Sequence, residues 1–142
     1  MNTKKLIFAV IAVFILLEAT SYLINGVFLS SIYMQEEISK VFRPVADMQH
    51  IMWRMWLADL VWSFFFVFIF IKGYQNKGWM EGVRYGVYIG LFMNLMASTA
   101  QNVFYPIPAS LALKWFIFGL IQTIILGVVT SFIYKNAEQK AA

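Results

Sequence analysis

The stretch LALKWFIFGLIQTIILGVVTSFIY, Leu111–Tyr134, decides the class of this protein. Its only charged residue is Lys114, close to its start, and most of the other side chains are apolar. A helix rises ~1.5 Å per residue, so about 20 apolar residues cross a hydrocarbon core ~30 Å thick. This stretch is therefore long and apolar enough to form a transmembrane helix.

Three further apolar stretches precede it, and charged residues lie almost entirely between the four. They run over Leu6–Tyr33, Ile51–Ile71 and Val83–Phe104. Little of the chain is left for a soluble domain. The sequence predicts an all-α fold: one integral membrane bundle of four transmembrane helices, forming a single domain over residues 1–142.

The composition supports the same class. The chain is 61% hydrophobic and only 13% charged, whereas a soluble domain is about 25% charged. The net charge of +4 is explained by Lys and Arg residues that anchor helix ends and contact anionic headgroups. We therefore expect the lipid bilayer, and either the protein itself or other membrane proteins, as partners, and not nucleic acid.

The absence of cysteine limits the chemistry. With no cysteine in the chain, disulfides, thiolate catalysis, Cys-ligated zinc and iron–sulfur clusters are excluded. The single histidine, His50, lies among methionines, a combination that suits Cu(I). Methionine is also a common gap filler in helices, so we interpret His50 as an interfacial residue and expect neither metal nor cofactor.

The orientation follows from the basic residues. One side holds both termini and the middle loop and carries seven Lys and Arg residues, against four on the other side. The positive-inside rule then places both termini in the cytoplasm. The basic start and apolar run at the N-terminus resemble a signal peptide, but no cleavage site of small residues follows. We expect a multi-pass protein of the bacterial inner membrane that retains its first span.

Small residues recur at helical spacing in the third and fourth stretches. In lipid, such residues let helix backbones approach closely. The two stripes are predicted to pack closely, either on each other or on a second copy or another subunit. The glycines concerned are Gly82, Gly86 and Gly90 in the third stretch, and Gly119 and Gly127 in the fourth.

Four polar side chains are predicted to share one level of the bilayer. Glu18, Asp59 and Gln122 each lie 13 residues from an inner-side lysine, about 20 Å along a helix, and Asn94 falls near the same depth. Buried ionisable groups in membranes face the bundle interior. Arg54 is the candidate counter-ion.

Two interpretations of this polar layer stay open. In the first, it is a hydrogen-bond lock that fixes which helices pair. In the second, Glu18 and Asp59 hold protons or cations, because two carboxyl groups in a low-dielectric medium do not both ionise easily. An enzymatic role has less support, since the sequence contains no pattern that indicates a catalytic residue set.

Parts of the chain resemble a known group of proteins. The run KGYQNKGWMEGVRYGVYIG, residues 72–90, together with PIPASLA at 106–112 and Trp115-Phe116, resembles small four-span bacterial membrane proteins of unknown function. The resemblance implies the fold and a bacterial membrane, and no functional residue.

The expected function is non-enzymatic: a small inner-membrane protein acting as a packing or accessory unit of an oligomer or membrane complex. The alternative is a small oligomeric transporter or channel for protons or small solutes that uses the intramembrane carboxyl groups.

Overall fold

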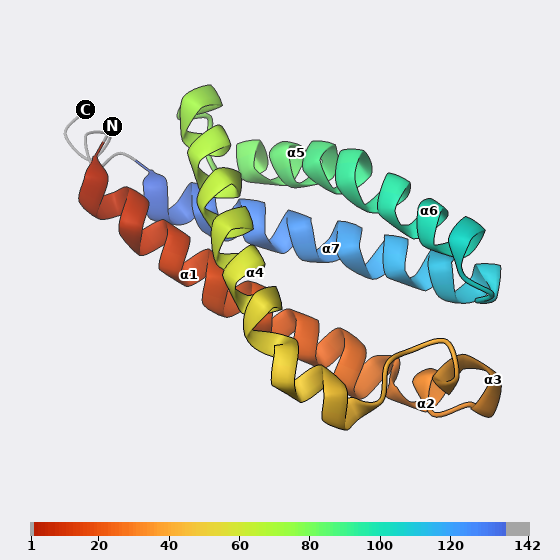
Figure 1. Cartoon of the computed structure of the whole chain (residues 1–142). Coiled ribbons are helices and arrows are strands. Elements are labelled where there is room, and N and C mark those ends of the chain that lie inside the picture. Colours follow the sequence, from red (N-terminus) through yellow and green to blue (C-terminus); the bar gives the residue numbers. More distant parts are fainter. Residues whose placement is uncertain (1, 136–142) are drawn as a thin grey trace, which may run out of the picture.

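The computed structural model describes residues 2–135, and it is helical with no strand over that range (Figure 1). Four helical runs follow one another along the chain. They consist of α1 (Thr3–Tyr22) continued by a π-helical segment (Leu23–Phe28); α4 (Val45–Gly73); α5 (Trp79–Gly90), a second π-helical segment (Leu91–Leu95) and α6 (Met96–Phe104); and α7 (Ala109–Tyr134). Two short helices, α2 (Ser30–Tyr33) and α3 (Glu36–Ser39), connect the first run to the second.

Three of these runs indicate a membrane protein. Within residues 2–135, Thr3–Phe28, Val45–Gly73 and Ala109–Tyr134 are long and apolar enough to cross a membrane. The run Trp79–Phe104 has a comparable length but is less apolar. It carries five polar side chains in its second half: Asn94, Ser98, Thr99, Gln101 and Asn102.

The first run ends earlier than the apolar pattern predicted. The helix stops at Phe28, and the chain turns at Leu29 into α2, so the expected end at Tyr33 is five residues too late. Leu29 and Tyr33 are apolar for a different reason, because both belong to a hydrophobic cluster that joins the connections at this end of the molecule. Hydropathy alone does not distinguish the two environments.

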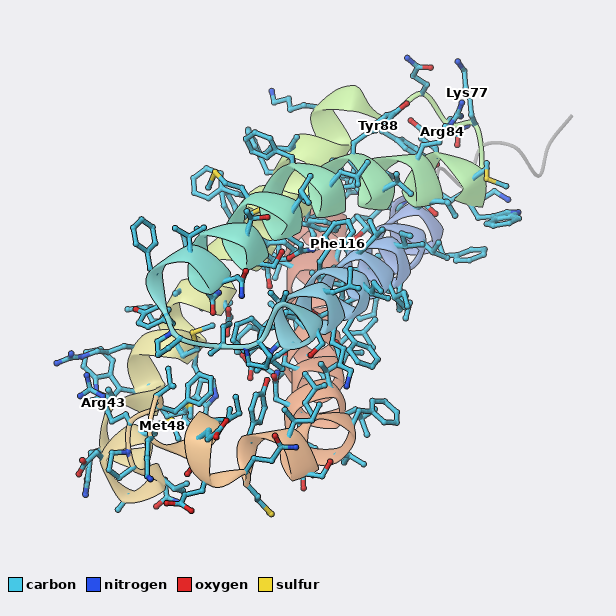
Figure 2. All side chains as sticks on the ribbon, turned by 90° about the vertical axis from the view of Figure 1, so that its right-hand side faces the viewer. Arg43, Met48, Lys77, Arg84, Tyr88 and Phe116 are labelled. Carbon is cyan, nitrogen blue, oxygen red and sulfur yellow. The ribbon has the colours of Figure 1, made fainter. Side chains whose placement is uncertain are left out.

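The helical runs alternate in direction. At one end, Lys5 Nζ donates a hydrogen bond to the Lys135 carbonyl at 3.2 Å, and the rings of Tyr74 and Tyr134 lie 5.7 Å apart. The ends of the described chain and the loop between α4 and α5 therefore share one end. The other two connections lie at the opposite end, where Phe42 packs against Trp115. Figure 2 shows the same separation, with Arg43 and Met48 at one end and Lys77 and Arg84 at the other.

Helices α5 and α7 lie side by side in closest contact (Figure 1). The predicted glycine stripes face each other here. A Cβ atom on Gly86 would lie 2.5 Å from the Cα of Ile124, and one on Gly82 would collide with the Gly127 carbonyl. Gly119 instead receives the Asn94 side chain, since its Cβ would lie 2.7 Å from Asn94 Cγ. Only glycine allows approaches this close.

The rest of the interior consists of two apolar clusters. The first joins α1, α4 and α7, with Val13, Val67 and Leu126 fully buried. The second, at the end that holds α2 and α3, contains Leu29, Ile38 and Leu111. Helix α4 crosses in front of α1 and α7 (Figure 1). It packs mainly on α1, and its second half also contacts α5, where the Tyr85 hydroxyl donates to the Phe66 carbonyl at 2.6 Å.

Candidate functional site

The carboxyl groups of Glu18 on α1 and Asp59 on α4 meet between the two helices. The two groups are close enough to influence each other electrostatically. An ionised carboxylate can only accept hydrogen bonds, so a bond between two carboxyl groups requires a proton on one of them. Glu18 Oε1 is enclosed, and no donor within residues 2–135 reaches it. The arrangement can hold a proton or an oxygen-ligated cation.

Ser63 adds a third oxygen to this face of α4. It follows Asp59 by four residues, a spacing that places both on the same side of a helix. Its side chain is 0% exposed, and its hydroxyl has no hydrogen-bond partner among the residues that the structure describes. Ser63 was not among the residues predicted from the sequence. Its four-residue spacing from Asp59 was the available signal.

Gln122 of α7 bonds to α1. Its Nε2 lies 2.7 Å from Thr20 Oγ1, 3.0 Å from Ser21 Oγ and 3.2 Å from the Leu17 carbonyl. An amide nitrogen carries two hydrogens, so these acceptors share two donors. The contact ties α1 to α7 at the depth of Glu18. Thr20 and Ser21 were missed because their hydroxyls give no charge signal in the sequence.

Asn94 is separate from the other polar residues of the predicted layer. It lies in the π-helical segment Leu91–Leu95, and its amide packs on Gly119 of α7. Its Nδ2 is buried with no partner in the described part of the chain. The four predicted residues therefore form three groups: a carboxyl pair, a Gln122 contact with α1, and an isolated amide.

Arg54 does not act as the counter-ion of Asp59. Its guanidinium lies 5.6 Å from the centre of the Trp53 ring, and the ion pair found within residues 2–135 joins Lys40 to Glu36 instead. A five-residue separation turns a side chain about 140° around a helix, so Arg54 and Asp59 leave α4 on different faces. The pairing was predicted from the depth of the two residues along α4. The direction in which each side chain leaves the helix was not considered.

The loop between α4 and α5 is held by one carboxylate. Glu81 Oε1 accepts from the backbone N–H of Gln75 at 2.5 Å, and Oε2 accepts from the backbone N–H of Lys77 at 2.9 Å. Burial, assisted by the Glu81 charge, raises the pKa of the Tyr74 phenol above its usual value. Glu81 therefore shapes both the backbone and the electrostatics of this loop.

Comparisons with known proteins identify no relative: no protein-family model, curated protein or solved structure matches the chain.

Proposed function

We propose that this chain is a four-span protein of the bacterial inner membrane with both termini in the cytoplasm. In this proposal it is a non-enzymatic packing or accessory unit of an oligomer or larger membrane complex. The group of small four-span bacterial proteins that the sequence resembles would share this architecture. The run Trp79–Phe104 is the third span along the chain, and its polar side chains are accommodated because part of it packs against α7.

The distribution of basic residues supports this orientation. The end that holds the α4–α5 loop carries Lys5, Lys72 and Lys77, while the opposite end carries Lys40 and Arg43 together with Glu36 and Glu37. Lys and Arg are in excess on cytoplasmic sides. The first of these two ends is therefore assigned to the cytoplasm.

The open face of α4 is the observation that carries the accessory role. This helix has no glycine before its last residue, packs mainly on α1, and presents its other side to the surroundings. A shallow groove of about 640 Å³ runs along that side, lined by Trp53, Leu57, Val61 and Phe65 among others. We assign it to a transmembrane helix of a partner or of a second copy.

Photo-crosslinking in native membranes tests this assignment. A photoreactive residue at Leu57 or Val61 is expected to yield a discrete protein adduct whose mass identifies the partner. Phe132, which is 62% exposed on α7, provides the control position. Adducts with lipid alone at Leu57 and Val61, matching those at Phe132, would contradict the accessory role.

The carboxyl pair favours a second candidate, an oligomeric proton or small-solute transporter. Within residues 2–135 neither carboxyl group forms an ion pair with a basic side chain, and the enclosed hydroxyl of Ser63 lies one turn along α4 from Asp59. Such a carboxyl pair suits reversible binding of a proton or cation better than a structural ion pair. In liposomes, proton flux lost in Glu18→Gln and Asp59→Asn, with the fold retained, would favour this candidate. Wild-type protein without flux would exclude proton transport and leave the accessory role.

A further inference from the structure

A small cavity of about 230 Å³ lies at the end of the molecule opposite the α4–α5 loop. Two parts of the chain that are far apart in sequence form it: the connection after α3, and the stretch from the end of α6 through the following turn to the first turns of α7. The lining residues are Val41, Phe42, Arg43, Gln101, Tyr105, Ile107 and Trp115. Pockets for drug-sized molecules usually measure about 300–1,000 Å³, so this one fits a small group.

Hydrogen bonds and ring contacts hold the walls of the cavity. The Asn102 amide donates to the Ile107 carbonyl at 2.8 Å, which fixes the turn between α6 and α7. The Trp115 ring packs edge-on against Phe42, and its Nε1–H donates to the Tyr33 hydroxyl at 2.7 Å. The Tyr33 hydroxyl in turn donates to Asn25 Oδ1 at 2.8 Å.

The polar groups of the cavity select for an anion. Arg43 supplies its only formal charge, and within residues 2–135 its guanidinium forms no ion pair; the ion pair at this end joins Glu36 and Lys40. The Gln101 amide and the Tyr105 hydroxyl form no side-chain hydrogen bond in the same range. Guanidinium groups bind phosphate and carboxylate through paired hydrogen bonds, and the amide and phenol add further donors.

The surroundings favour a lipid as the source of the anion. Apolar side chains flank the cavity, with Val103 73% exposed and Phe104 79% exposed. Aromatic residues of this kind gather at headgroup level in membrane proteins. A phosphate in the cavity would thus leave its acyl chains room along α6.

We propose that this cavity binds the phosphate of one outer-leaflet phospholipid, with Arg43 as the ionic partner and Gln101 and Tyr105 as supporting donors. The inference rests on the proposed membrane-spanning arrangement. It goes beyond that proposal because it assigns a ligand to a site outside the polar layer.

Native mass spectrometry of the full chain in mild detergent tests the proposal. Phosphatidylglycerol and, as a lipid without phosphate, diacylglycerol are added separately. The wild-type protein is expected to retain one phosphatidylglycerol at least tenfold more tightly than diacylglycerol. Arg43→Gln should lose most of this preference.

Two control variants each remove one positive charge from another position at this end of the molecule. Lys40→Gln affects an exposed lysine paired with Glu36, and Arg54→Gln affects a guanidinium that lies over Trp53. Both should bind phosphatidylglycerol as the wild type does. Equal losses in all three variants would overturn the site, because they would indicate only general attraction of anionic lipid.

A further arm separates lipid from soluble phosphate. Millimolar inorganic phosphate should not displace the bound lipid. The lipid assignment would be overturned if inorganic phosphate displaced the bound lipid in an Arg43-dependent way and the protein did not prefer phosphatidylglycerol to diacylglycerol. Failure of the membrane-spanning proposal gives a different result, since the wild-type chain would then not incorporate into vesicles.

Discussion

Gly82 of α5 and Gly127 of α7 lie backbone to backbone. A Cβ atom on either residue would collide with the carbonyl oxygen of the other. One turn further along α5, Gly86 lies against Thr123 and Ile124 in the same manner. At Gly82 and Gly86 the α5–α7 contact is thus made by main chain, so even a methyl group is too large there.

The first prediction concerns this contact. Gly86→Ala should destabilise the protein by about 1–3 kcal/mol, the usual cost of overpacking, because its Cβ would lie 2.5 Å from main-chain atoms of α7. Gly73→Ala is the matched control, since no atom lies within 4 Å of a Cβ built there. Gly78 is unsuitable as a control because its φ of +84° strains any side chain. Thermal unfolding in detergent measures both variants, and equal midpoints would refute the close contact.

The second prediction concerns Gln122. Gln122→Leu removes the hydrogen bonds to Thr20, Ser21 and the Leu17 carbonyl, so α1 should separate more readily from α7. The cost should be about 0.6 kcal/mol, the average measured for interhelical hydrogen bonds in a membrane, and at most about 1.7 kcal/mol. A double-mutant cycle with Thr20→Val, followed by unfolding in detergent, isolates the pair. A coupling energy of zero would show that the bond contributes nothing.

The third prediction concerns topology. Reporter fusions after Gln75 should give a cytoplasmic signal, and fusions after Ser39 a periplasmic one, because the two connections lie at opposite ends of the molecule. Changing the distribution of basic residues tests whether it causes this orientation. Neutralising Lys72 and Lys77 together should weaken the orientation, whereas neutralising Lys40 and Arg43 should strengthen it. A periplasmic signal at Gln75 in the wild-type protein would reverse the proposed orientation.

The fourth prediction concerns the alkaline range. The pKa of Tyr74 is raised in the folded protein, so the folded state keeps its phenolic proton at pH values where the unfolded state has lost it. This contribution to stability is present below the usual tyrosine pKa of about 10 and is lost as the pH rises toward the folded value. Glu81→Gln should lower the folded pKa, because it removes the charge that assists burial. Ultraviolet titration of tyrosinate, with Tyr74→Phe to assign the signal, measures the change, and an unaltered pKa would rule out the influence of Glu81.

Several features could be predicted from local sequence. The lengths of the apolar runs predict helices that can cross a membrane, and three of them have that length and character in the structure. The four-residue spacing of Gly82, Gly86 and Gly90 predicts a close contact along one face. These properties depend on residues a few positions apart, so helical geometry alone relates them.

Tertiary structure decided the rest, because direction around a helix and the choice of neighbour depend on distant segments. The sequence placed Arg54 and Asp59 at adjacent depths, but packing of α4 on α1 directs Asp59 to Glu18, while Arg54 lies over Trp53. Gln122 meets α1 only because three helices share a core. The sequence by itself determined the helices and their spacing; the tertiary structure decided which polar groups meet, since those pairings arise from long-range packing that no local pattern encodes.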